Sequence, residues 1–219
     1  MIEIQDLSKT YQQAGSAIHA VNGVNISIEK GQTVAITGRS GSGKTTLLTL
    51  LAGLDRPTHG QISILGKNLT SMSEKEMGQF RGENIGIVFQ KFHLMPYLTA
   101  LENVSLPLEI LGVKDADKKA SEALALVGLE DRLTHLPAQL SGGECQRVAI
   151  ARALVTGPSI LLADEPSGNL DSHTGQKVMD LLFELAEKKK STLILVTHDQ
   201  TLASRCQRQI NLTAGSISQ

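Results

Sequence analysis

The chain has 219 residues, only 3 % aromatic residues, no tryptophan and a formal net charge of −1. This length predicts one α/β domain with room for a smaller inserted part, and the composition predicts a core built mainly of aliphatic side chains. The balanced charge gives no electrostatic reason to expect nucleic acid or an anionic membrane as a direct ligand.

The first predicted elements are strands. Residues 2–11 and 24–29 alternate polar and apolar side chains, which predicts an antiparallel opening of the fold. The apolar stretch Thr33–Thr37 predicts a buried strand that runs into a glycine-rich turn, and Lys44–Ala52 predicts a helix that ends at Gly53. Two more strands are expected at residues 61–65 and 84–89.

The middle of the chain changes character. From residue 90 to residue 158, short helical patterns and loops replace strands, and the apolar residues between 120 and 127 fall on one helical face. We therefore expect an inserted α-helical subdomain at 90–158. The rest of the chain, 1–89 and 159–219, is expected to form the core subdomain.

Two continuous apolar stretches, residues 159–163 and 192–197, predict strands of a covered parallel sheet. Between them, apolar residues from Val178 to Ala186 follow i, i+3, i+4, i+7, i+8 spacing, which is typical of an amphipathic helix. This order predicts a βαβ unit. The tail, residues 209–219, resembles a terminal hairpin.

The turn after Thr33–Thr37 carries the strongest motif. It matches G-x-x-x-x-G-K-[ST], in which glycines let backbone N–H groups turn toward phosphates at the start of a helix. We expect Lys44 to reach the β- and γ-phosphates and the Thr45 hydroxyl to ligate Mg²⁺. The alternative, an ordinary Gly/Ser turn, is disfavoured by the strand before the motif and the helix after it. The predicted triphosphate-binding set is Gly38, Arg39, Ser40, Gly41, Ser42, Gly43, Lys44, Thr45 and Thr46.

A second motif places two acids at the tip of the strand at 159–163. Asp164 is expected to hold Mg²⁺, and Glu165 to polarise the attacking water. Such general-base catalysis contributes roughly 10²–10⁴ in rate. The alternative is a pair of solvated acids, and the phosphate loop upstream argues against it.

A third motif opens the helical stretch at 145–154. Ser141 and Glu144 have the spacing of a capping box, an ordinary helix start. A capped start that contains Gly142 and Gly143 is also an anion site, so both interpretations hold together.

Together with the motifs above, the rest of the sequence resembles ATP-binding cassette (ABC) nucleotide-binding domains. The resemblance rests on five motifs in the family's order over nearly the whole chain: GRSGSGKTT, the glutamine of VFQ, LSGGECQRVAIARAL, ILLADEP and the histidine of LVTHD. It implies an ABC-type P-loop NTPase fold with an antiparallel β subdomain. It also implies that two chains enclose two ATP molecules. Ser141, Gly142, Gly143 and Glu144 of one chain would then contact the nucleotide of the other.

The same resemblance implies roles for single residues. Tyr11 would stack on adenine, with a core aromatic on a strand as the alternative. Gln90 would touch Mg²⁺ and water, with a polar strand end as the alternative. His198 would act as the switch histidine in catalysis, together with Glu165, Lys44 and Gln90. Asp171 belongs to Gly168–Asp171, which matches the D-loop of the dimer seam.

Position 145 departs from the family, whose members more often carry a long polar residue there. A neutral substitution on a helix is one interpretation of Cys145, and a redox-sensitive thiol is the other. The only other cysteine, Cys206, is far away in the sequence, so we expect a reducing, cytosolic compartment.

The sequences SGNLD, ALENVSLPL and LPAQLSGGE resemble one bacterial branch that contains MacB-, LolD- and YbbA-type ATPases, YbbA-type proteins most of all. This implies a homodimer that drives separate integral-membrane permease subunits from the cytoplasmic face of the inner membrane, by efflux, lipid or lipoprotein extraction, or mechanotransmission. Contact with the permease is expected near residues 90–102. No apolar run reaches the roughly 20 residues of a membrane span, so the membrane role comes through that partner.

Two rival functions remain from the sequence. One is a soluble ABC ATPase that acts on nucleic acid or ribosomes, against which stand the single cassette and the absence of heptad repeats between the phosphate loop and the signature. The other is a nucleotide-gated scaffold without catalysis, against which stand Glu165 and His198.

Overall fold

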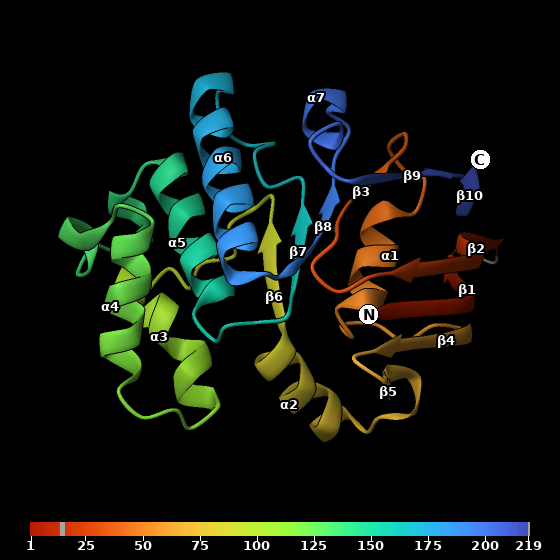
Figure 1. Ribbon diagram of the computed structural model, residues 1–219, viewed down its shortest axis with the longest axis horizontal. Helices are drawn as coiled ribbons and strands as arrows, with labels where there is room; N and C mark the ends of the chain where they lie inside the picture. Colours follow the sequence, from red (N-terminus) through yellow and green to blue (C-terminus); the bar gives the residue numbers. More distant parts are fainter. Residues whose placement is uncertain (14–15, 219) are drawn as a thin grey trace. The chain divides into compact units, whose positions relative to one another are not determined.

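The computed structural model describes residues 1–13 and 16–218. The chain forms two compact units (Figure 1). The first consists of Met1–Gly78 with Thr192–Gln219, and the second of Gln79–Ser191. This division differs from the predicted subdomains at 1–89 with 159–219 and at 90–158, whose boundaries stay a prediction.

An antiparallel sheet opens the first unit, with strand order β2-β1-β4-β5. Strand β1 pairs with β2 from Ile2 opposite Ile28 to Gln13 opposite Ser16, so the antiparallel opening predicted from the sequence is confirmed. Strand β2 begins well before the predicted residue 24, because its first residues, 16–19, are all exposed and show no alternation. The strand bounds are Ile2–Gln13 for β1, Ser16–Ile28 for β2, His59–Ile64 for β4 and Lys67–Asn68 for β5.

A second set of strands in this unit is centred on β3 (Thr33–Thr37), which has the predicted bounds. It pairs in parallel with β8 (Thr192–Val196) and with β9 (Arg208–Thr213). All of β8 is buried, as expected for a covered parallel strand. The predicted hairpin also forms, with β10 (Ser216–Ser218) antiparallel to β9. Helices α1 (Lys44–Leu51) and α7 (Gln200–Ala203) belong to the same unit.

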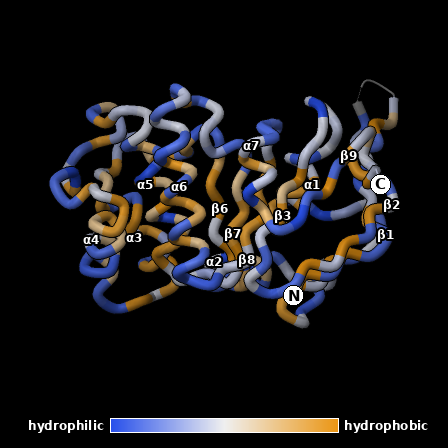
Figure 2. Tube along the Cα trace, turned by 45° about the horizontal axis from the view of Figure 1, so that its top comes forward, coloured by the Kyte–Doolittle hydropathy of each residue, from blue (hydrophilic) through white to orange (hydrophobic). Residues whose placement is uncertain are grey.

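The second unit combines two parallel strands with several helices. Strand β6 (Ile85–Phe89) pairs with β7 (Ile160–Asp164), and hydrophobic stretches run along both in Figure 2. The predicted stripe on α6 is confirmed, since Val178, Leu182, Leu185 and Ala186 are buried and Leu181 is half-buried. The helices are α3 (Ala100–Ile110), α4 (Ala116–Leu126), α5 (Gly142–Leu154) and α6 (Ser172–Lys189).

Helix α2 (Glu74–Asn84) was not predicted from the sequence. Only Met77 and Phe80 are buried on it, and two glycines interrupt it, so the sequence shows no helical stripe. Three short 3₁₀ turns lie at Leu69–Ser71, Glu130–Arg132 and Pro137–Gln139. Across the described ranges 1–13 and 16–218, no helix has the length and apolar character required to cross a bilayer.

Candidate nucleotide-binding site

The predicted phosphate loop connects the end of β3 to the start of α1. Gly38, Gly41 and Gly43 have φ angles of 144°, 77° and 98°, a backbone region that favours glycine. A Cβ on Gly38 would collide with the carbonyl oxygen of Leu212, and one on Gly43 with that of Ala20. The glycines of the motif therefore let the loop pack directly on neighbouring backbone.

Helix α1 presents its N-terminus to this loop. The N-cap residue is Gly43, so no side chain caps the helix, and no acidic residue lies in its first turn. The first backbone N–H groups of a helix have no partner within it and carry a partial positive charge. An uncapped, acid-free helix start at a glycine-rich loop is a site for an anion such as a phosphate group.

Lys44 is held inside the loop. Its side chain is only 7 % exposed, and Nζ donates hydrogen bonds to the carbonyl oxygens of Gly38 (2.8 Å) and Arg39 (3.0 Å). Ser42 is also buried, and its hydroxyl oxygen has no partner among the residues that the structure describes. A buried ammonium and a spare buried hydroxyl suit a loop that encloses a charged oxygen-rich group.

The loop forms one side of a cleft of about 680 Å³ in the first unit. His198, two residues beyond β8, lines the same cleft as Gly38–Ser42, so the structure brings the predicted switch histidine to the phosphate loop. Gln200 and the β9–β10 hairpin, residues 211–214, complete the lining. The sequence predicted this hairpin but gave no signal that it would border the nucleotide cleft.

Tyr11 lies on β1 and is 38 % exposed, so the alternative of a core aromatic is wrong. Its hydroxyl donates a hydrogen bond of 2.8 Å to Asp55 Oδ2, and the Thr46 side chain also bonds this hydroxyl. Thr46 belongs to the first turn of α1. The structure therefore places Tyr11 beside the start of the phosphate-loop helix.

In the second unit, β6 and β7 end side by side. Phe89 is the register partner of Asp164, so Gln90 and Glu165 follow at the same edge. Asp164 and Glu165 are half-buried rather than fully solvated. Glu165 has a φ of 43°, a left-handed conformation that is rare outside glycine and is enriched at functional sites.

The predicted signature begins α5 as expected. The Ser141 hydroxyl accepts a hydrogen bond from the Glu144 amide, and Glu144 Oε2 accepts one from the Ser141 amide at 2.8 Å. The predicted capping box is therefore confirmed. Bonds from the Ser141 amide and hydroxyl, aided by Arg132, lower the pKa of Glu144 from 4.5 to about 2 despite partial burial. Ser141 and Gly142 are exposed, whereas Gly143 is buried against Thr174.

Helix α5 is tied to the end of β6 by Gln146, which the sequence did not single out. Gln146 is fully buried, and its Nε2 donates to the carbonyl oxygen of Phe89 at 3.2 Å. Asp171, the predicted D-loop aspartate, is the N-cap of α6. Its Oδ1 accepts hydrogen bonds from the backbone amides of His173 and Thr174. These bonds lower the pKa of Asp171 and keep it ionised.

Comparison with known proteins identifies the family. A family model described as ABC transporter matches residues 21–168. This chain belongs to the ABC transporter family. Similarity to this family and to its ATP-binding members supports ATP binding and hydrolysis as the activity, and nothing in it supports the nucleic-acid alternative.

Two relatives cover almost the whole chain. The lipoprotein-releasing system ATP-binding protein LolD of Legionella pneumophila (strain Lens) is 52 % identical over 215 residues, which is 97 % of this chain and 95 % of the relative. The uncharacterized ABC transporter ATP-binding protein YbbA of Escherichia coli (strain K12) is 46 % identical over 221 residues, 100 % and 97 % of the two chains. The predicted branch is thus confirmed, although this LolD is more similar than this YbbA.

Solved ABC cassettes confirm the predicted fold. A dimeric cassette in a post-hydrolysis state, bound to ADP and phosphate, has a TM-score of 0.92 and 42 % identity, and the match covers 100 % of this chain and 97 % of that one. A dimeric bacterial ABC transporter cassette matches with the same TM-score, the same coverage and 43 % identity. The chain is therefore an ATP-binding, ATP-hydrolysing ABC subunit with the predicted P-loop fold.

Proposed function

We propose that this ABC subunit works as a homodimer in which ATP joins the two chains. The phosphates would lie in the Gly38–Thr45 loop of one protomer, and Ser141, Gly142 and Gly143 of its partner would close over them. The observation that carries this proposal is the exposure of Ser141 and Gly142 at the N-terminus of α5, which leaves this helix start accessible to a second chain.

The donor set of this chain fits a magnesium ion. The Thr45 hydroxyl, the Asp164 carboxylate and the Gln90 amide supply hard oxygen ligands, and Mg²⁺ is usually bound by one or two carboxylates together with substrate phosphates. When bound, the ion supplies neutralisation of phosphate charge. Among the described residues, no group of three or more His, Cys, Asp or Glu side chains is arranged to hold a metal ion by itself, and we propose that the phosphates supply the remaining ligands.

Each proposed site residue has its own role at the nucleotide. Lys44 exchanges the carbonyl oxygens of Gly38 and Arg39 for phosphate oxygens, because its ammonium already lies inside the loop. Glu165 accepts a proton from the attacking water, and His198 contacts the γ-phosphate from the cleft that it lines. Tyr11 stacks on adenine.

The dimer is proposed to drive integral-membrane permease subunits, with the chain held at the cytoplasmic face of the inner membrane. The names of the LolD and YbbA relatives support a transport-type partner. The region proposed to contact the permease, residues 90–102, ends in the capping box that begins α3. There the Thr99 side chain accepts a hydrogen bond from the Glu102 amide, and the Glu102 side chain accepts one from the Thr99 amide. Purification of the chain with permease subunits from detergent-solubilised membranes would support this partner, and purification with ribosomes or DNA instead would contradict it.

The substitution Glu165→Gln tests the proposed site. We expect ATP affinity to remain and turnover to fall by roughly 10²–10⁴, because the variant cannot accept the proton of water. An ATP-dependent dimer should then accumulate in size-exclusion chromatography. The matched control is Glu187→Gln, an exposed glutamate near the end of α6. Wild-type turnover in Glu165→Gln would contradict the general-base role.

A further inference from the structure

A compact cluster of polar side chains surrounds Tyr11 in the first unit. Its hydroxyl donates to Asp55 Oδ2 at 2.8 Å, and Lys9 Nζ donates to Asp55 Oδ1 at 2.7 Å. The same ammonium lies 4.9 Å from the centroid of the Tyr11 ring, within cation–π distance. Asp55 thus holds both the hydroxyl of Tyr11 and the cation over one face of its ring.

Charge reinforces this arrangement. Burial opposes ionisation of Asp55, but hydrogen bonds from Lys9, Tyr11 and the Arg56 amide outweigh it and hold the pKa of Asp55 below its usual value. Burial and then the Asp55 carboxylate raise the pKa of Tyr11. At neutral pH a charged acceptor therefore faces a protonated phenol, and hydrogen bonds to charged groups are stronger than neutral ones.

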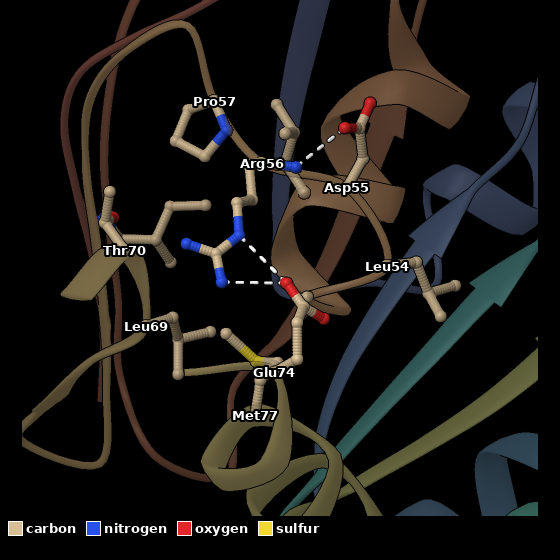
Figure 3. A pocket seen from close by; sticks show the side chains of 11 residues that line it. Leu54, Asp55, Arg56, Pro57, Leu69, Thr70, Glu74 and Met77 are labelled. Carbon is tan, nitrogen blue, oxygen red and sulfur yellow. Dashed lines mark hydrogen bonds and ion pairs between the residues drawn. The ribbon is translucent and has the colours of Figure 1, made fainter. Parts of the chain in front are cut away.

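Asp55 is itself fixed in place. Its Oδ1 also accepts the amide of Arg56 at 2.7 Å, and Lys9 Nζ additionally donates to the Arg56 carbonyl at 2.7 Å. Figure 3 shows the Arg56 guanidinium turned to Glu74, to which it donates at 2.8 and 3.0 Å. Because Arg56 is engaged by Glu74, its guanidinium does not compete with Tyr11 for Asp55.

We propose that Asp55 is a positioning residue that fixes the ring of Tyr11 and so sets how strongly the chain selects an adenine nucleotide over phosphate alone. This inference rests on the proposed stacking of adenine on Tyr11. Stacking of one base on an aromatic side chain accounts for roughly 5- to 150-fold in affinity, and a ring free to rotate loses part of that gain. Asp55 acts only through the ring, so the phosphate loop keeps its own affinity.

The test compares binding of ATP and of inorganic tripolyphosphate to the whole protein by calorimetry. Tyr11→Ala should weaken ATP binding about tenfold or more and leave tripolyphosphate binding unchanged. Asp55→Ala should weaken ATP binding about 3- to 10-fold, again without effect on tripolyphosphate. Asp55→Asn keeps an oxygen that can accept from Tyr11 and should restore part of the loss.

Two further variants isolate the contact. Glu187→Gln, an exposed glutamate near the end of α6, serves as the control and should bind both ligands as the wild type does. In the Tyr11→Phe background, Asp55→Ala should cause a smaller loss than in the wild type, because the hydroxyl is already absent and only the contact that holds Lys9 over the ring remains to be removed.

The outcomes separate the two proposals. Unchanged ATP binding in Tyr11→Ala would refute adenine stacking, and this inference with it. Weakened binding in Tyr11→Ala but wild-type binding in both Asp55 variants would leave stacking standing and overturn the role of Asp55. Equal losses for ATP and tripolyphosphate in Asp55→Ala and Asp55→Asn would also overturn it, since they would show damage to the phosphate loop instead.

Discussion

Gln90 and Asn169 are joined by a pair of hydrogen bonds. Gln90 Nε2 donates to Asn169 Oδ1 at 3.3 Å, and Asn169 Nδ2 donates to the backbone carbonyl oxygen of Gln90 at 3.1 Å. Gly168 lies so close that a Cβ on it would come within 2.7 Å of Gln90 Nε2. In the second unit the end of β6 is therefore tied to the turn that follows Asp164 and Glu165, so a shift of one segment displaces the other.

Asn169→Ala should lower ATP turnover about 3- to 10-fold while ATP affinity stays near that of the wild type, because Gln90 loses the partner that orients its amide. Steady-state ATPase assays and calorimetric titration with ATP provide the two measurements. In a Gln90→Ala background the second substitution should have a smaller effect than in the wild type, because only the bond from Asn169 to the backbone carbonyl of residue 90 remains to be lost. Additive losses would show that Asn169 acts independently of Gln90.

The phosphate loop offers a matched pair of glycines. Gly43→Ala forces a Cβ onto the Ala20 carbonyl at a φ of 98°, and we expect it to abolish ATP binding and to lower the melting temperature. Gly41→Ala has a similar left-handed backbone, but nothing lies within 4 Å of the new Cβ. It should cost only about 1–2 kcal/mol of strain, or roughly 2–8 °C. Equal melting temperatures for the two variants would contradict the collision at Gly43.

The phosphate loop and its flanking elements could be predicted from the sequence because their signals are local. The strand Thr33–Thr37 and the helix start at Lys44 agree with the structure residue by residue. The capping box from Ser141 to Glu144 was also predicted, since its two members are three residues apart and bond each other.

The surroundings of Tyr11 could not be predicted in this way. Asp55 is 44 residues from Tyr11 and stands in a turn whose composition carries no sign of a partner on β1. The contact of Gln146 could not be predicted either, because its hydrogen bond to the Phe89 carbonyl oxygen spans 57 residues. Contacts of this kind depend on sheet register and helix packing, which local propensity and periodicity do not specify.

Neither cysteine is expected to react quickly in the folded protein. Burial, together with the charge of Glu144, raises the pKa of Cys145, and its thiol lies 3.5 Å from the Pro137 carbonyl. Burial raises the pKa of Cys206 to about 11. At pH 8 few thiolates form, so alkylation should be slow and ATPase activity should be unchanged, whereas both thiols should react in denaturant.

Cys145→Ser serves as the control for this alkylation, which is followed by mass spectrometry of the intact protein. The neutral-substitution interpretation of Cys145 requires slow labelling at this position. Rapid labelling of Cys145 with a parallel loss of turnover, absent in Cys145→Ser, would instead support the redox-sensitive thiol.

Glu144 predicts a specific acid dependence of stability. Its pKa in the folded chain is about 2, below its usual 4.5, so its stabilisation is fully present above the value of the unfolded chain. That stabilisation is lost as the pH falls from about 4.5 toward 2. Glu144→Gln keeps a side chain suited to the capping box but does not titrate, so its free energy of unfolding should decline less steeply with acid in this window.

Urea unfolding of wild type and Glu144→Gln at several pH values between about 5 and 3 measures this difference. The wild-type curve should fall toward that of the variant as the pH decreases, while exposed Glu187→Gln should run parallel to the wild type. Glu76 and Glu102 occupy equivalent capping positions with lowered pKa values, so both proteins retain some acid sensitivity and only the difference between them reports on Glu144. A constant difference across the whole range would mean that the Ser141 cap does not depend on the charge of Glu144.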